Sequence, residues 1–159
     1  MVDMLVKLYD LPQAELPMES MDRLGIRIRT AMPHERLDVV EWVQQTFGRG
    51  WAGECDTAFS RLPVTCFIAE EKGSLIGFSC HEVTCRGFFG PMGVAENQTG
   101  KGVGRALLLA SLQAMKAKGY AYAVIGGTES MDFYRKTVNA IPIEGSSPGI
   151  YPPLLKRRG

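Results

Sequence analysis

The stretch 86-RGFFGPMGVAENQTGKGVGRALLLASL-112 joins an apolar run, a polar glycine-rich loop and a second apolar run. The second run repeats apolar residues every three or four positions, which predicts a helix beginning near Val103. Glycine permits backbone conformations that a Cβ would block, and a helix N-terminus offers unpaired N–H groups with partial positive charge. The combination predicts a binding site for phosphate oxygens, with Lys101 and Arg105 adding positive charge. Three glycines alternate around the start of this helix: Gly100, Gly102 and Gly104.

Two better-known phosphate loops do not match this stretch. An ATP-binding P-loop needs GxxxxGK followed by Ser or Thr, and the chain contains no such string. The dinucleotide pattern GxGxxG fails because a window that starts at Gly100 or at Gly102 has no glycine in the last position. The remaining alternative is a glycine-rich turn that only precedes a core helix.

The elements on either side of the loop read as strands and one short helix. Gly90, Pro91 and Gly93 interrupt the apolar run before the loop, which predicts a bulge or a local splay of that strand. Before it, VTCFIAEE and SLIGFSCHEVTC are separated by Lys72 and Gly73 and predict a hairpin. After the loop helix, which Gly119 should end, AYAVIGG predicts a buried strand and SMDFYRKT a short helix.

The N-terminal third predicts one strand and two helices. The segment GIRIRTAMP alternates apolar and charged residues as a half-buried strand does. A helix follows with Leu37, Val40, Val43 and Phe47 at helical spacing, and a second helix is expected within 51–62. The second helix would have one apolar stripe: Trp51, Cys55, Phe59 and Leu62. Residues 1–24 are expected as an N-terminal extension, and 25–159 as a single domain.

Composition excludes several classes of protein. A chain of 159 residues with 45% hydrophobic and 22% charged residues is an ordinary globular protein of about one domain. Its net charge of +1 argues against a nucleic-acid partner, and no apolar run is long enough to span a membrane. Because Asp3 stands where a signal peptide is basic, a cytoplasmic location is expected. The four cysteines form no CxxC pair and the two histidines no HExxH pair, so no metal site is expected.

Taken together, these motifs resemble the GNAT superfamily of acyl-CoA N-acyltransferases, most clearly over residues 88–134 and in outline over 26–145. The family's phosphate loop has the form [Q/R]xxGx[G/A] after a strand that ends in valine, and Val94, Gly102 and Gly104 fit this form. Thr99 stands at the Gln/Arg position, with Gln98 one residue earlier. The segment 133-FYRK-136 resembles the family's FYxK segment.

The resemblance implies an α/β (α+β) fold with a mixed, mostly antiparallel central sheet, splayed near its centre and flanked by helices. Acetyl-CoA would be the co-substrate, with its pantetheine arm in the splay, its pyrophosphate on the loop amides, and no metal required. The implied binding residues are Met92, Gly93, Val94, Thr99, Gly100, Lys101, Gly102, Val103, Gly104 and Arg105.

Aminolysis of a thioester needs a neutral amine, donors for the oxyanion and a proton or hydrogen bond for the leaving thiolate. By its place in the FY segment, Tyr134 inherits the thiolate role, the alternative being a half-buried aromatic with a satisfied hydroxyl. The oxyanion donor would be a backbone N–H near Met92 or Val94. The general base is open between Glu54 and His81, and removal of the proton by water is equally compatible. Two further acids are candidates for the same role: Glu82 and Glu129.

The function that follows from the resemblance is acetyl transfer from acetyl-CoA to a primary amine of a small-molecule or peptide acceptor. The alternative is a non-catalytic acyl-CoA-binding sensor on the same scaffold, which Thr99 and the absence of an acid on the strand 88–94 favour. A nucleotide-binding regulatory domain would need the motifs excluded above. A homodimer is expected because the N-terminal residues would otherwise form an apolar free tail. The acceptor pocket would contain four aromatic residues: Trp51, Phe88, Phe89 and Tyr151.

Overall fold

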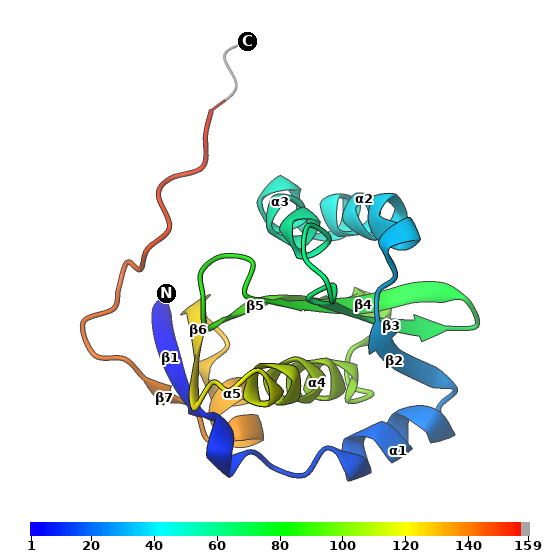
Figure 1. Ribbon diagram of the computed structural model, residues 1–159, viewed down its shortest axis with the longest axis horizontal. Coiled ribbons are helices and arrows are strands. Elements are labelled where there is room, and N and C mark those ends of the chain that lie inside the picture. Colours follow the sequence, from blue (N-terminus) through cyan, green and yellow to red (C-terminus); the bar gives the residue numbers. More distant parts are fainter. Residues whose placement is uncertain (157–159) are drawn as a thin grey trace.

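The structure is a computed structural model that describes residues 1–156. Seven strands form one sheet in the order β2-β3-β4-β5-β6-β1-β7 (Figure 1), and every neighbouring pair is antiparallel except β5 and β6, which are parallel. This confirms the mixed, mostly antiparallel sheet expected from the sequence. The strands are β1 (Val2–Lys7), β2 (Ile26–Thr30), β3 (Cys66–Glu71), β4 (Ser74–His81), β5 (Phe88–Val94), β6 (Tyr122–Thr128) and β7 (Ile141–Pro142).

Helices cover both faces of this sheet. In Figure 1, α2 (Arg36–Phe47) and α3 (Arg49–Ala58) lie on one face, and α1 (Glu15–Arg23), α4 (Val103–Ala117) and α5 (Met131–Val138) lie on the other. Three single turns of 3-10 helix join the elements: Leu8–Asp10, Pro33–Glu35 and Glu96–Gln98. No helix within residues 1–156 has the length and apolar character that crossing a membrane requires.

The helix after the glycine loop forms where the sequence predicts it. It begins at Val103 and ends at Ala117, and Gly119 lies just beyond with a φ of +98°, a left-handed conformation that stops a helix. Its leucines 107, 108, 109 and 112 have no exposed surface, so α4 is the apolar centre of its side of the sheet. The predicted hairpin is also present, with Lys72 and Gly73 at positive φ between β3 and β4.

Of the segment 1–24, expected as an extension, residues 2–7 form strand β1 inside the sheet. Strand β1 pairs with β6 on one side and with β7 on the other. Met4, Val6 and Leu8 have no exposed surface and pack in the same core as Leu108 and Leu112. Insertion between two strands therefore buries the apolar N-terminal residues that the sequence reading assigned to a tail.

On the face covered by α2 and α3, two of the leucines predicted to be buried are exposed. Leu37 is 79% exposed and Val39 takes its place in the core beside Val43. Helix α3 ends at Ala58, so Leu62 falls after the helix and is 86% exposed. The first error is one of phase, because a leucine next to the stripe cannot be told from one within it by spacing alone. The second is one of helix length, because α3 ends before Leu62.

Candidate active site

The parallel pair β5 and β6 separates after a short contact. The strands pair only at Phe88 with Val124 and at Phe89 with Ile125. Gly90 follows with a φ of +115°, a conformation open mainly to glycine, and beyond it the two strands diverge. A cavity of about 1390 Å³ occupies the region between the diverging strands, the glycine loop and helix α5. The splay expected from the glycines and proline of this strand is therefore present.

The edge of β5 that faces this gap carries free backbone groups. The N–H of Ala95 donates to the carbonyl of Ile76, on the β4 side. Because N–H groups alternate between the two edges along a strand, those of Met92 and Val94 point away from β4 and toward the gap. They lie on the edge where the sequence analysis placed the oxyanion donor.

The glycine loop supplies a second set of free donors at one end of the cavity. Gly100 and Gly102 have φ values of +82° and +87°, and Gly102 is the N-cap of α4 without any side-chain cap. The first internal bond of the helix runs from the N–H of Ala106 to the carbonyl of Gly102. The N–H groups of residues 103–105 consequently have no protein partner among the hydrogen bonds of residues 1–156, as an anion site requires.

Gly104 serves packing and not an unusual backbone angle. A Cβ at this position would lie 3.7–3.9 Å from Val94, Phe133 and Met92, which is ordinary contact. The first turn of α4 therefore sits directly against β5 and α5, at the place where the cavity narrows. A side chain longer than alanine here would extend into that narrow part.

Nine of the ten binding residues predicted from the sequence line the cavity, and Lys101 is the exception. Its ammonium lies 2.6 Å from Oε1 of Gln98 and 3.8 Å from a carboxylate oxygen of Glu71, a residue of β3. The loop thus turns Lys101 toward the neighbouring strand, and of the loop's two cations it is Arg105 that lines the cavity. The nine that line it are Met92, Gly93, Val94, Thr99, Gly100, Gly102, Val103, Gly104 and Arg105.

Tyr134 lies on α5 with its side chain at the cavity and only 8% of the residue exposed. Burial raises the pKa of its phenol to about 12, so the hydroxyl keeps its proton at neutral pH. Its ring packs against Phe133 and Phe89, and no hydrogen bond within residues 1–156 engages its hydroxyl. The hydroxyl is therefore a donor held in an apolar wall.

The four other ionisable candidates differ sharply in position. His81 ends β4, is 2% exposed, stacks on Phe67 and does not line the cavity. Burial lowers the pKa of His81 to about 4, so the imidazole is neutral. Glu82 also lies outside the cavity, paired with Lys118 at 2.9 Å and hydrogen-bonded by the Tyr120 hydroxyl.

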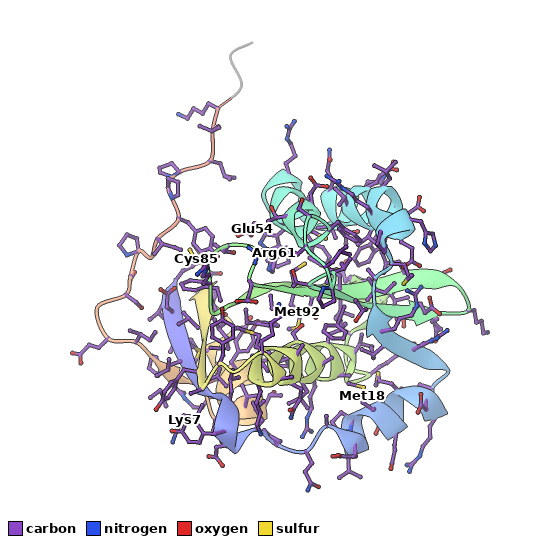
Figure 2. The ribbon with its side chains drawn as sticks, in the orientation of Figure 1. Lys7, Met18, Glu54, Arg61, Cys85 and Met92 are labelled. Atoms are coloured by element: carbon purple, nitrogen blue, oxygen red, sulfur yellow. The ribbon has the colours of Figure 1, made fainter. Side chains whose placement is uncertain are left out.

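Glu54 and Glu129 do line the cavity. Glu54 projects from α3, on the opposite side of the sheet from Met92 (Figure 2), and accepts a hydrogen bond from the hydroxyl of Thr84. The Tyr151 hydroxyl lies 3.5 Å from Oγ1 of the same threonine. A carboxylate from α3, the 82–87 loop and the C-terminal segment thus meet at the end of the cavity away from the glycine loop.

Aromatic side chains complete that end, and one of them was missed. Trp51, Phe89 and Tyr151 line the cavity as expected, whereas Phe88 packs beside it against Gly126. The missed residue is Phe47, which spacing assigned only to the core. Its ring occupies the place where a side chain of Gly93 would stand, since a Cβ there would come within 2.4 Å of it.

The C-terminal segment lines the same end, and Tyr151 is the one residue of it that the sequence analysis placed there. The ring of Tyr151 packs on the glycine pair 126–127, where a Cβ would lie 3.1–3.3 Å from it. Leu154 reaches the start of α3, and residues 151–155 all line the cavity. The only sequence signal for these contacts is the glycine pair at the end of a strand, which fits many other roles.

The same fold occurs in solved structures of known proteins. A GCN5-related glucosamine N-acetyltransferase region of a fungal multi-domain β-N-acetylglucosaminidase shares the fold with a TM-score of 0.73 and 17% identity, covering 89% of this chain and 19% of that one. A GCN5-related N-acetyltransferase from Sphaerobacter thermophilus has a TM-score of 0.61 and 20% identity, covering 89% of this chain and 48% of that one. An aminoglycoside acetyltransferase from an uncultured soil metagenomic sample has a TM-score of 0.55 and 12% identity, covering 87% of this chain and 99% of that one. The chain thus spans less than half the length of the first two. No curated protein matches the sequence at a significant level.

The sequence itself matches the profile of one protein family. The profile of the Acetyltransferase (GNAT) family matches residues 36–139, which include α2, α3, the splayed strands, the glycine loop and α5. That range covers well over half of the chain and contains nearly every element that builds the cavity. The chain belongs to the GNAT family of acetyltransferases.

Proposed function

We propose that the protein is an acetyl-CoA-dependent N-acetyltransferase that acts on a primary amine by direct attack on the thioester. The observation that carries the proposal is one continuous cavity. It runs from the free amides of the glycine loop, along the open edge of β5, to Tyr134 and to the acidic and aromatic end around Glu54.

Each part of acetyl-CoA has a matching feature along this path. The N–H groups of residues 103–105, with Arg105, would hold the pyrophosphate. The free edge of β5 would pair with the amide groups of the pantetheine arm as a missing strand does. An N–H of Met92 or Val94 would then donate to the thioester carbonyl oxygen, which gains negative charge in the tetrahedral intermediate.

Tyr134 and Glu54 are proposed on opposite sides of the reacting carbon. Glu54 accepts a proton from the incoming ammonium group, directly or through water, and so produces the neutral amine that attacks. The amine nitrogen bonds to the carbonyl carbon, and the carbon–sulfur bond breaks as the intermediate collapses. The Tyr134 hydroxyl gives its proton to the leaving sulfur, which departs as the thiol of CoA, and the second proton lost by the new amide nitrogen returns through water to the tyrosine oxygen. His81 is not a base in this scheme, because it lies outside the cavity.

The acceptor end favours a compact amine with polar groups around it. Glu54 and Glu129 offer carboxylates, and Trp51 and Tyr151 offer aromatic faces that attract cations. Two proteins with the same fold are described as acting on glucosamine and on aminoglycosides. Amino sugars are therefore the first acceptors to test, with amino acids and short peptides beside them. A cytoplasmic location and a homodimer stay predictions from the sequence, although the burial of Met4, Val6 and Leu8 in the chain's own core removes the reason given for the homodimer.

The first experiment measures binding and turnover separately. Acetyl-CoA at one hundred times its Kd should stabilise the fold by about 2.7 kcal/mol, a rise in Tm of roughly 5–10 °C, whereas ATP and NAD should have no effect. An amine panel is then screened for release of free CoA thiol. Stabilisation by CoA with no thiol release from any amine would favour the non-catalytic sensor instead.

The second experiment tests Glu54. Glu54→Gln should lower kcat/KM for the acceptor about tenfold or more while acetyl-CoA affinity is kept, because the carboxylate lies at the acceptor end. Glu41→Gln is the matched control, since Glu41 is an exposed glutamate of α2 whose only side-chain partner within residues 1–156 is Gln45. Equal kcat/KM in both variants would assign proton removal to water.

A further inference from the structure

Three of the four cysteines come together beneath α3. Cys55 lies on α3, Cys66 on β3 and Cys80 on β4, and none has any exposed surface. Their three sulfur atoms all lie within 4.8 Å of one another, and all three are free thiols. The fourth cysteine, Cys85, is exposed on the loop after β4 (Figure 2). Sequence spacing did not predict this cluster, because no two of its members are close in sequence.

Regular structure fixes the position of each thiol. Cys66 and Cys80 are directly opposite each other in the antiparallel β3–β4 pair, so their side chains share one face of the sheet. Cys55 belongs to the buried side of α3 together with Ala52 and Ala58, three residues away in each direction. A helix and two central strands therefore hold the three sulfur atoms, with no flexible loop involved.

The surroundings decide which ion this trithiol cluster suits. It lies inside an apolar core with Val43, Ala58, Ile68 and Phe78, and no histidine or carboxylate of residues 1–156 joins the three thiols as a further ligand. Zinc prefers four ligands and would leave a net negative charge on three thiolates, and a buried net charge is costly. A trivalent ion bound by three thiolates is neutral and needs no fourth ligand.

We propose that Cys55, Cys66 and Cys80 form a binding site for a trivalent thiophilic metalloid of the chemical class of arsenite. The reaction is ligand exchange without any change of oxidation state. Three arsenic–oxygen bonds of As(OH)₃ break and three arsenic–sulfur bonds form. The three thiol protons leave with the three hydroxides as water.

Access to the site requires α3 to move. The sulfur atoms are covered, and the same helix contributes Trp51, one turn before Cys55, and Glu54 to the cavity described above. Binding therefore waits for a local opening of this helix, so we expect it to be slow and to accelerate under mildly denaturing conditions.

The test uses the reduced full-length protein and arsenite as the probe. After removal of free arsenite, we expect one arsenic per chain in the wild type and in Cys85→Ala. In Cys55→Ala, Cys66→Ala and Cys80→Ala, which each keep two of the three thiols, we expect at least tenfold weaker retention. Undiminished retention in Cys55→Ala, or its loss in Cys85→Ala, would overturn the site.

A measurement on the wild type alone keeps the test independent of whether the variants fold. Arsenic X-ray absorption should show three sulfur neighbours and no oxygen. Two sulfur neighbours, or no retained arsenic after prolonged incubation with arsenite in mild denaturant, would refute the proposal. Tighter retention of zinc than of arsenite would refute the preference for a trivalent ion.

Discussion

The two ends of the cavity are built in opposite ways. The glycine-loop end is one continuous segment that offers backbone N–H groups, and only Arg105 adds a charge to it. The acceptor end is assembled from side chains of α2, α3, the 82–87 loop, β6 and the C-terminal segment. Backbone donors do not depend on side-chain identity, so Thr99 in place of the family's Gln or Arg leaves them intact. The acceptor end depends on side-chain identity, so under the proposed function its side chains would select the amine.

Tyr134 lies on the wall of this cavity, and its replacement carries the largest expected effect. Tyr134→Phe keeps the buried ring and removes only the hydroxyl, which no hydrogen bond within residues 1–156 engages. If the hydroxyl stabilises the leaving thiolate, kcat should fall about 100-fold while acetyl-CoA affinity stays nearly constant. Steady-state kinetics with a working amine, together with Tm, measures both.

The control for this variant is Phe133→Leu, which changes the neighbouring aromatic without touching the hydroxyl. A Tyr134→Phe protein with full kcat would make Tyr134 a packing residue. The thiolate would then take its proton from water, and the two ends of the cavity would have no catalytic side chain between them.

His81 lies outside both ends of the cavity, so we expect its titration to change folding stability and not catalysis. The unfolded chain binds a proton near pH 6.5 and the folded chain only near pH 4, so folding stability falls as pH drops between these values. Between pH 7 and pH 5 we expect a loss on the order of 2 kcal/mol that His81→Phe abolishes. Urea unfolding at the two pH values measures this difference.

The same variant separates the structural role of His81 from a catalytic one. His81→Phe should keep kcat within about twofold at neutral pH, because the residue does not line the cavity. A large loss of kcat in a folded variant would restore His81 as the base. The pKa of Glu35 is lowered by Arg29 from 4.5 to about 2, so this group costs stability mainly below pH 4.5 and adds little between pH 7 and pH 5.

The difference between the two ends also explains what the sequence could predict. The loop, its helix and the splay depend on neighbours in sequence, since the glycine spacing, the apolar period and Pro91 are all local signals. The contacts of Phe47 with Gly93 and of Tyr151 with the pair 126–127 join segments that lie far apart in the chain. No local pattern encodes them, and the same holds for the insertion of β1 between two strands.

Gly104 tests the loop end directly. A Cβ at this position meets only ordinary contacts, so Gly104→Ala should bind CoA nearly as the wild type does. The larger side chain in Gly104→Val should fill the narrow part of the cavity and weaken CoA binding about tenfold, or 1.4 kcal/mol. Calorimetric titration with CoA measures the affinity of each variant.

The matched control is Gly53→Val, at an exposed helical glycine of α3 that meets nothing within 4 Å and does not line the cavity. It carries the same cost of a β-branched residue in a helix. If CoA bound equally well to Gly104→Val and Gly53→Val, the loop would not hold the pyrophosphate.

The smallest expected effect is on CoA affinity, and it distinguishes two cations of the loop whose contributions to binding the sequence alone could not rank. Lys101 and Arg105 are four residues apart around the same loop, yet only Arg105 lines the cavity, while Lys101 turns to Gln98 and Glu71. Arg105→Ala should weaken CoA binding by about 0.5–1 kcal/mol, roughly two- to fivefold, because an exposed ion pair with phosphate contributes little more than this. Lys101→Ala should change the affinity by less than about 1.5-fold, since its charge is already neutralised by Glu71.

Raising the salt concentration should weaken CoA binding to the wild type and to Lys101→Ala equally, and to Arg105→Ala less. The reverse ranking would mean that Lys101 leaves Glu71 when the phosphates arrive, and that the loop end depends on a mobile side chain as well as on its backbone.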